Sequence, residues 1–211
     1  INQQDHIKGK VGDVTIEANT RASQPSSIFT TDDVRIFGAN VAIKSTINHE
    51  VKGTGKFPGG DDLTIIGTKS VSITKDVGSQ NDVYIKSTGP LSITGNVNSD
   101  TDKGSNGYIR IYNDGPNAPT TISGNLKAWN CGFDCGAEEV RIEVDGPLTV
   151  SGAVTALGGG VYIRNHRKHA PTLISGNVFG GEGDVDVGVI GPLTISGNLT
   201  AGGRDCCVYC G

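Results

Sequence analysis

The chain has 211 residues, with 32 Gly, 8 Pro, no Met and a formal net charge of −4. This length allows one sizeable core, and the evenly repeating sequence predicts a single domain over residues 1–211. The mild charge and the scattered basic residues argue against a nucleic-acid partner. No apolar run reaches the length of a membrane-spanning helix, so we expect no membrane span.

One nine-residue phrase recurs along the chain. Residues 191–199 read Gly-Pro-Leu-Thr-Ile-Ser-Gly-Asn-Leu, and close copies occupy residues 89–97 and 146–154. Looser copies at residues 118–126 and 170–178 begin with Ala-Pro-Thr. Internal repetition at a period of roughly 20 to 30 residues is typical of a solenoid, a propeller or a similar array.

A second phrase, an acidic residue or Gly followed by alternating apolar positions, precedes these copies. Its first apolar residues are Val14, Val34, Leu63, Val83, Ile109, Val140, Val161 and Val185. The alternation predicts two short strands per repeat, joined at a Gly-Pro corner. A propeller blade needs about 40 residues, but the basic step here is near 20. The sequence therefore predicts an all-β fold, a parallel β-solenoid (β-helix) of about eight rungs with loop insertions and essentially no helix.

Five cysteines lie in two groups, which are Cys131 with Cys135, and Cys206, Cys207 and Cys210. The repeats cover residues 13–203, and residues 204–211 form a Cys-rich tail. Because the chain begins at Ile1 without any Met, we expect a signal peptide to have been removed and the protein to be extracellular or at the cell surface. Disulfide cross-links are then favoured over the zinc site that the spacing of Cys207 and Cys210 also permits. The odd count leaves one thiol free or joined to another molecule.

Polar side chains recur at fixed positions of the repeat. An Asn follows the second strand in four copies and predicts an inward ladder of hydrogen bonds, formed by Asn96, Asn125, Asn177 and Asn198. Small hydroxyls predict a lateral packing or binding face on the second strand, formed by Ser92, Thr94, Thr121, Ser123, Thr149, Ser151, Thr194 and Ser196. This array resembles the ice-binding face of solenoid antifreeze proteins, but Ser replaces Thr at half the sites and Leu173 interrupts it.

The outward positions of the first strand are bulkier. They carry Arg35, Tyr84, Lys86, Arg110, Tyr112, Arg141, Glu143, Tyr162 and Arg164. Tyr and Arg are favoured in protein interfaces and in sugar-binding faces, and a solvated strand face is the alternative.

Aspartates stand at the start of several rungs. Turn capping by these side chains is expected, and no cofactor is predicted. A Ca²⁺ ion bridging neighbouring turns at Asp62 and Asp82 is the open alternative. His166 and His169 flank two basic residues in one loop, but no nucleophile elbow, phosphate loop or acid pair accompanies them. We therefore predict no catalytic residues and no enzymatic activity.

A solenoid has two sheet edges, and the sequence offers neither a helix nor a polar cap to cover them, which predicts end-to-end stacking. The Gly-Pro-Leu-Thr-Ile-Ser-Gly-Asn-Leu repeats resemble those of secreted prokaryotic β-solenoid surface proteins, the class that contains filamentous-haemagglutinin-like adhesins. The Cys-rich tail resembles the disulfide-stabilised sheaths of methanogenic archaea.

We accordingly expect a structural protein that self-assembles with further copies into a filament, sheath or surface layer. The alternatives are a secreted adhesin or a carbohydrate- or ice-binding solenoid, with cell-surface proteins or glycans as partners. A polysaccharide-acting enzyme is the third hypothesis.

Overall fold

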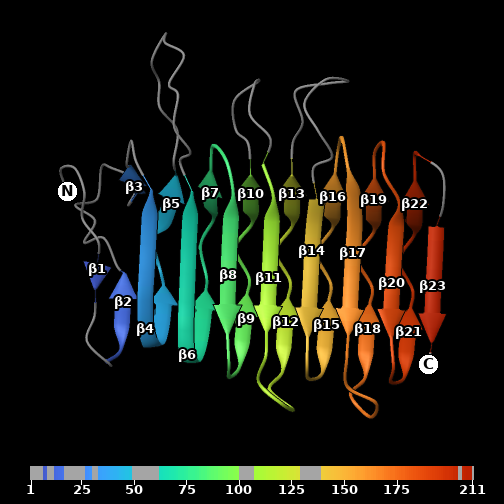
Figure 1. The fold of residues 1–211 in the computed structure, drawn as a ribbon. Helices are drawn as coiled ribbons and strands as arrows, with labels where there is room; N and C mark the ends of the chain where they lie inside the picture. The colour runs from blue at the N-terminus through green and yellow to red at the C-terminus, as the bar shows by residue number, and fades with distance from the viewer. Residues whose placement is uncertain are drawn as a thin grey trace, which may run out of the picture.

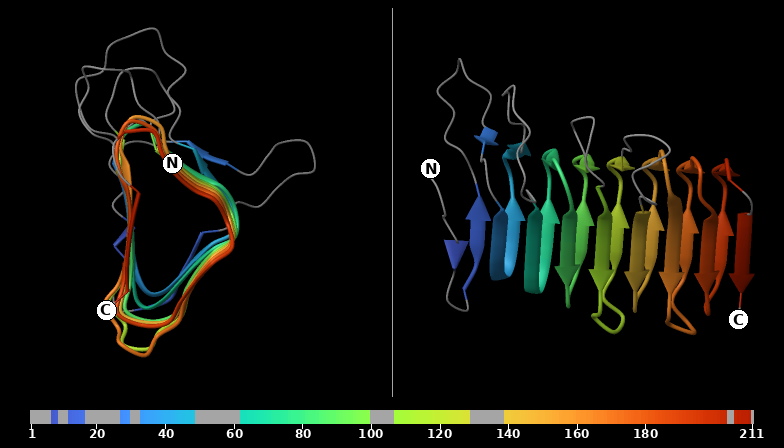
Figure 2. Two further views of the ribbon diagram at one scale, coloured as in Figure 1. Left: turned by 90° about the vertical axis from the view of Figure 1, so that its right-hand side faces the viewer. Right: turned by 45° about the horizontal axis from the view of Figure 1, so that its top comes forward.

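The computed structural model describes residues 7–8, 12–16, 27–29, 33–48, 62–99, 107–128, 139–203 and 206–210. Every regular element in these ranges is a β-strand, and all strand pairs are parallel. The chain winds into a three-sided solenoid whose coils stack along one axis (Figures 1 and 2). The prediction of an all-β parallel β-solenoid, free of helix in the described ranges, is confirmed.

Each coil has three strands, one on each face, rather than the two that the alternation predicted. The first face contains β1 (Ile7–Lys8), β8 (Val83–Ser87), β11 (Ile109–Asn113), β14 (Glu139–Val144), β17 (Gly160–Asn165), β20 (Val185–Val189) and β23 (Cys206–Cys210). The second contains β2 (Val14–Ile16), β9 (Leu91–Ile93), β12 (Thr120–Ile122), β15 (Leu148–Val150), β18 (Thr172–Ile174) and β21 (Leu193–Ile195).

The third face contains β3 (Ser27–Phe29), β5 (Thr46–Asn48), β7 (Val77–Ser79), β10 (Val97–Ser99), β13 (Leu126–Ala128), β16 (Val154–Ala156), β19 (Val178–Gly180) and β22 (Leu199–Ala201). These strands are only three residues long, too short for alternation alone to predict them. Two longer strands, β4 (Val34–Ile43) and β6 (Leu63–Ile73), bend across the first corner and join the first two faces into one sheet.

The core is built from in-register columns of aliphatic side chains. On the first face Ile65, Ile85, Ile111, Ile142 and Ile163 follow one another on successive coils, and all are fully buried. Strands lie about 4.8 Å apart in such a stack, so each branched side chain packs directly on the next. The inward positions predicted from period-2 alternation are thus the core positions.

The regular part of the solenoid has about six turns, slightly fewer than the eight rungs predicted. From β6 onward the complete coils are β6–β7, β8–β10, β11–β13, β14–β16, β17–β19 and β20–β22, and β4–β5 precedes them with the same arrangement as β6–β7. The phrase at Val14, expected to be a first strand, pairs with Val41 and therefore occupies the second face. Conversely, residues 206–210 of the expected tail form β23, which pairs with β20 and continues the first face.

At the second corner, between the second and third faces, glycines are required because the backbones of successive coils approach closely. The positions Gly95, Gly124, Gly152, Gly176 and Gly197 stack on one another, and a Cβ atom at each would lie 1.9–2.1 Å from a carbonyl oxygen of the preceding coil. The close approach of the two backbones, rather than an unusual backbone angle, therefore selects Gly in the Ser/Thr-Gly-Asn phrase.

Among the described residues, no helix is long and apolar enough to cross a membrane.

Candidate functional site

The recurrent asparagines form a ladder on the outside of the second corner, not on the inside as predicted. Asn96 Oδ1 accepts the backbone N–H of Asn125 at 3.0 Å, and Asn125 Oδ1 accepts that of Ala153 at 2.9 Å. Asn177 Oδ1 accepts the N–H of Asn198 at 3.1 Å. The side chains are exposed or half-buried because the corner turns its outer edge to solvent. Asn96, Asn125 and Asn177 thus each cap an N–H of the next coil.

Ala153 interrupts this ladder, which gives a prediction. Replacing Ala153 by Asn would place an acceptor opposite the N–H of Asn177, and a net gain of about 1 kcal/mol in the free energy of unfolding is expected. Chemical denaturation of the two proteins measures the gain. A midpoint that does not rise, or that falls, would show that the ladder bonds add no stability.

The aspartates that directly precede strands of the first face form a second ladder, at the corner between the third and first faces. Asp33 Oδ1 accepts the N–H of Asp62 at 3.1 Å, Asp62 Oδ1 accepts that of Asp82 at 3.2 Å, and Asp82 Oδ1 accepts that of Tyr108 at 3.0 Å. The carboxylates thus make the capping contacts expected of turn aspartates. Among the described residues, no group of three or more His, Cys, Asp or Glu side chains is arranged to hold a metal ion.

Asp82 gives a pH-dependent prediction. Burial raises the pKa of Asp82 above its usual 3.8, and repulsion from Asp62 adds to this, while the N–H of Tyr108 and the charge of Arg110 oppose it. Because the folded-state pKa is raised, the stability that protonation contributes is present below the unfolded pKa and is lost as the pH rises through the folded pKa.

Asp82→Asn keeps an oxygen acceptor for Tyr108 and removes the charge. Its free energy of unfolding should therefore exceed that of the wild type near pH 7, and the difference should shrink as the pH falls through the raised folded-state pKa toward about 4, where the unfolded Asp82 titrates. Urea denaturation across this range tests the sign. A difference that is constant with pH would contradict the role given to the charge.

The hydroxyl face is narrower than predicted. Ser72, Ser92, Thr121, Thr149 and Thr194 occupy one register column with Leu173. From β9 onward this column is the single outward position of each three-residue strand on the second face. The second predicted column contains Thr94, Ser123, Ser151 and Ser196, which lie after the strands end, at the corner. Thr94 Oγ1 donates to the carbonyl of Ile73 at 3.4 Å. The structure therefore shows one hydroxyl column on this face, not a flat two-column array.

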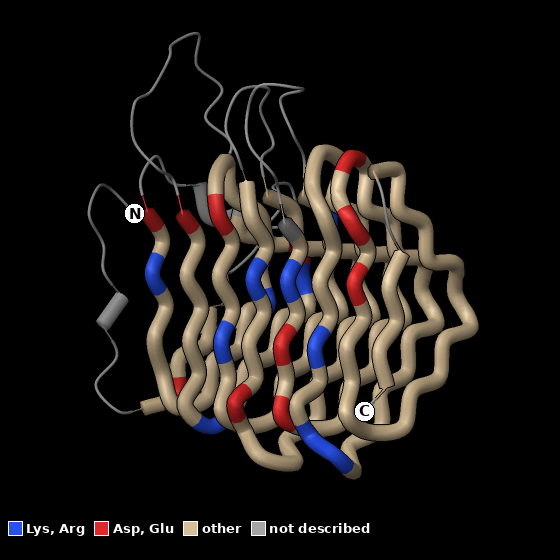
Figure 3. The backbone as a smooth tube through the Cα atoms, turned by 45° about the vertical axis from the view of Figure 1, so that its right-hand side comes forward, with Lys and Arg blue, Asp and Glu red and all other residues tan. Residues whose placement is uncertain are grey.

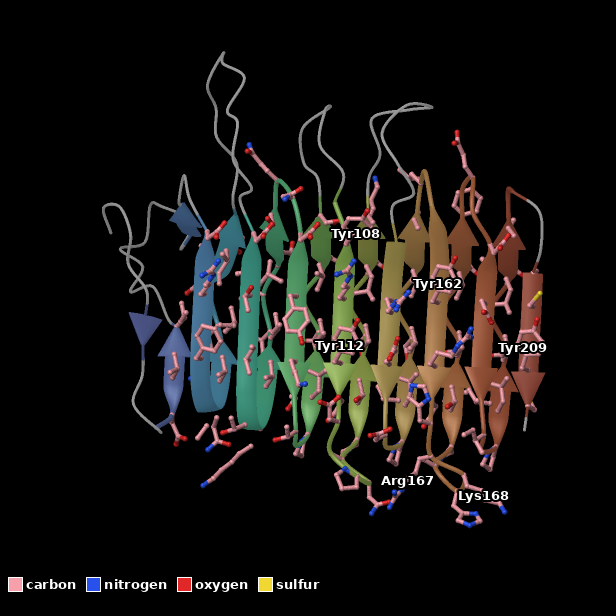
Figure 4. The ribbon with its side chains drawn as sticks, in the orientation of Figure 1. Tyr108, Tyr112, Tyr162, Arg167, Lys168 and Tyr209 are labelled. Atoms are coloured by element: carbon pink, nitrogen blue, oxygen red, sulfur yellow. The ribbon has the colours of Figure 1, made fainter. Side chains whose placement is uncertain are left out.

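The first face carries the aromatic and charged side chains, as Figures 3 and 4 show. The Tyr84 and Tyr112 ring centroids lie 5.5 Å apart, and the Arg110 guanidinium lies 4.8 Å from the centre of the Tyr108 ring. Arg164 forms a two-pronged ion pair with Asp186. The hydrogen bond with Asp186 raises the pKa of Arg164. These neighbouring charges compensate one another, as on a solvated strand face.

Three cysteines are presented by β23. Cys206, Val208 and Cys210 are in register with the buried Val185, Val187 and Val189, so they lie on the core-facing side of the sheet. Cys206 and Cys210 are nevertheless exposed, and Cys207 lies half-buried on the opposite side. None of the three forms a disulfide with a described residue. Cys131 and Cys135 lie outside the described residues.

Tyr209 stands beside Cys207 on the outward side of β23. The hydrogen bond with the Cys207 side chain raises the pKa of Tyr209, and Tyr209 is 58% exposed. Figure 4 shows Tyr209 at the end of the first face, beyond Tyr112 and Tyr162. β23 therefore combines three free thiols with exposed aromatic and apolar side chains.

Sequence reasoning missed a pair of buried asparagines. Asn113 and Asn165 end β11 and β17, and their Nδ2 groups donate to Thr120 Oγ1 and Thr172 Oγ1, each at 2.9 Å. The signal was present in the repeats, because the two Ala-Pro-Thr copies have Thr where the Gly-Pro-Leu copies have Leu. Each Thr is the partner of a buried Asn seven residues earlier.

The fold and these surfaces define the chain as a three-sided parallel β-solenoid repeat protein. No protein-family model matches the chain, and neither the curated proteins nor the solved structures contain a significant match.

Proposed function

We propose that the chain is an extracellular structural protein whose copies assemble into a filament, sheath or surface layer. Assembly occurs by end-to-end pairing of coil edges and by disulfide cross-links through the thiols of β23. The observation that carries this proposal is the display of Cys206, Cys207 and Cys210 on one accessible strand.

The geometry of β23 supports pairing with cysteines elsewhere. Cys206 and Cys210 point to the same side but are four residues apart, about 13 Å in a strand, whereas the Cα atoms of a disulfide lie about 4.4–6.8 Å apart. Cys207 points to the opposite side from both. The three thiols of an intact strand therefore do not pair with one another.

The odd number of cysteines supports a disulfide link between molecules. Cys131 and Cys135 supply at most two partners within the chain, and five is an odd number. At least one thiol per chain is then left for another molecule once the others are oxidised.

Apolar surface around β23 supports contact with a second copy. Leu193, Ile195 and Leu199 are only partly buried, in contrast to their fully buried counterparts on earlier coils, and Val208 is 44% exposed. Apolar surface of this kind is stabilised when another coil packs on it. Contact would bring the thiols of two molecules together.

Electrophoresis with and without reductant tests the cross-link. Oxidised wild-type protein should run as covalent dimers and higher species that collapse to the monomer on reduction. The variant Cys206→Ser, Cys207→Ser, Cys210→Ser should run as a monomer in both conditions. The matched variant Cys131→Ser, Cys135→Ser shows whether the other group supplies the partners. Wild-type protein that stays monomeric after oxidation would contradict the proposal.

A further inference from the structure

Two of the corners that connect the first face to the second are longer than the corresponding corners of the other described coils. Residues 114–119 connect β11 to β12, and residues 166–171 connect β17 to β18, whereas residues 145–147 suffice between β14 and β15. In Figure 1 the two long loops project beyond the strand ends, on either side of the short corner. The loops belong to coils two steps apart, so they stand roughly 10 Å from each other along the stack.

A groove of about 450 Å³ lies between them. Its lining comes from Asn117 of the first loop, Pro147 of the short corner, and residues 166–171 of the second loop. Sites for small ligands commonly have volumes of about 300–1,000 Å³. The groove therefore has room for a small ligand or for one segment of a polymer.

The second loop makes the groove basic. Residues 166–169 are His-Arg-Lys-His, and all four are exposed. No carboxylate among the described residues lies within 4.0 Å of the cationic groups of Arg167 or Lys168. Figure 4 shows both on the projecting loop. Two fixed positive charges with several N–H donors are thus available to an anion.

Two nearby carboxylates, Glu143 and Asp114, contact cationic groups other than Arg167 and Lys168. Glu143 lies 3.7 Å from Nε2 of His166, which lines the groove, and 3.5 Å from Arg141 on the first face. Asp114 is paired with Lys86 at 2.5 Å, and this contact raises the pKa of Lys86. Asp145 belongs to the short corner, where its backbone carbonyl, not its carboxylate, accepts the N–H of Asn117 at 3.2 Å. None of these contacts involves Arg167 or Lys168, so their charges are available to an anionic ligand.

We propose that this groove binds an acidic saccharide, with a carboxylate or sulfate group held by Arg167 and Lys168. Pro147 and Pro171 supply apolar surface for the C–H face of a sugar ring, and the amide of Asn117 hydrogen-bonds hydroxyls from the opposite loop. No Phe, Tyr or Trp lines the groove, so the stacking platform that single-stranded nucleic acid requires is missing from it.

The two long loops are held by equivalent hydrogen bonds, so the sequence of one can replace that of the other in a test variant. Asn113 Oδ1 accepts the N–H of Gly115, and Asn165 Oδ1 accepts that of Arg167, each at 3.1 Å. In each loop a backbone hydrogen bond closes a turn: the N–H of Ala118 donates to the carbonyl of Gly115, and the N–H of Ala170 donates to that of Arg167. Both loops also end in Ala-Pro-Thr. Replacing residues 166–169 by the Asp-Gly-Pro-Asn of the other loop should thus leave the coil intact.

Isothermal titration with oligogalacturonate tests the groove, with reductant present so that disulfide assembly plays no part. Wild-type protein should bind it and should not bind a neutral dextran oligosaccharide of equal length. Arg167→Gln, Lys168→Gln should weaken binding at least tenfold, and the loop replacement should abolish it. The control Lys69→Gln, Lys75→Gln removes the same charge at exposed positions about four coils away and should bind like the wild type.

Three results would overturn the proposal. These are no binding of oligogalacturonate by the wild type, equal binding by the Arg167→Gln, Lys168→Gln variant, and binding of a DNA oligonucleotide as tight as that of the saccharide. Circular dichroism of each variant shows whether the solenoid is folded, and the loop replacement and the double Gln variant provide independent comparisons.

Discussion

Gly152→Ala should destabilise the solenoid by about 3 kcal/mol, since adding a methyl group to a tightly packed interior forces backbone shifts. The new Cβ would lie 2.0 Å from the carbonyl oxygen of Gly124 and 2.8 Å from that of Ser123. Both atoms belong to the backbone of the preceding coil, which strand pairing on all three faces holds in place. Neither can move aside without disturbing the stack.

Chemical denaturation measures the effect of Gly152→Ala. Ser151→Ala is the matched control, because it alters the adjacent exposed residue of the same corner and should change stability by less than about 0.5 kcal/mol. If Gly152→Ala were as stable as the control, the coils would not approach as closely at this corner as the structure indicates.

Asn165→Val should also cost about 3 kcal/mol. Asn165 is 1% exposed, and its Nδ2 donates to the carbonyl of Gly146 at 3.0 Å and to Thr172 Oγ1 at 2.9 Å. Its Oδ1 accepts the N–H of Arg167. Valine fits the column, since Val144 and Val189 occupy the same register position on the adjacent coils. The loss therefore comes from polar groups left without partners, each worth about 1–3 kcal/mol.

A double-mutant cycle separates this effect from packing. Thr172→Leu restores the residue found at the equivalent Leu148 and Leu193 positions. In the Asn165→Val background it removes the unsatisfied hydroxyl, so the double variant should be more stable than the sum of the single changes by about 1 kcal/mol or more. Strictly additive changes in the free energy of unfolding would contradict the buried pair.

The repeat phrases were sufficient to predict the solenoid and its core. Residues such as Ile85 and Ile93 alternate with polar residues, and stacked rungs bury one side of that alternation. The third strand was missed because Val97–Ser99 and its equivalents are too short to show a period. The position of Val14 was misassigned because a three-residue alternating phrase does not reveal which face it joins, and only its pairing with Val41 decides this.

The polar ladders show the same limit. The recurrence of Asn96 and its equivalents predicted a ladder, but the direction of each side chain depends on the sense of the corner, which recurrence does not reveal. The buried Asn113 and Asn165 were missed because their partners are seven residues away, across a loop of a length that the other corners lack. The groove between the two long corners could not be predicted, since it depends on coils two steps apart.

Sedimentation velocity of the oxidised protein, before and after reduction, tests the proposed assembly most directly. The wild type should sediment as a broad distribution of large species that shifts toward the monomer with reductant. The variant Cys206→Ser, Cys207→Ser, Cys210→Ser should sediment as smaller species at every redox state. A wild-type protein that sediments as one monomeric species, unchanged by oxidation or reduction, would contradict the structural role.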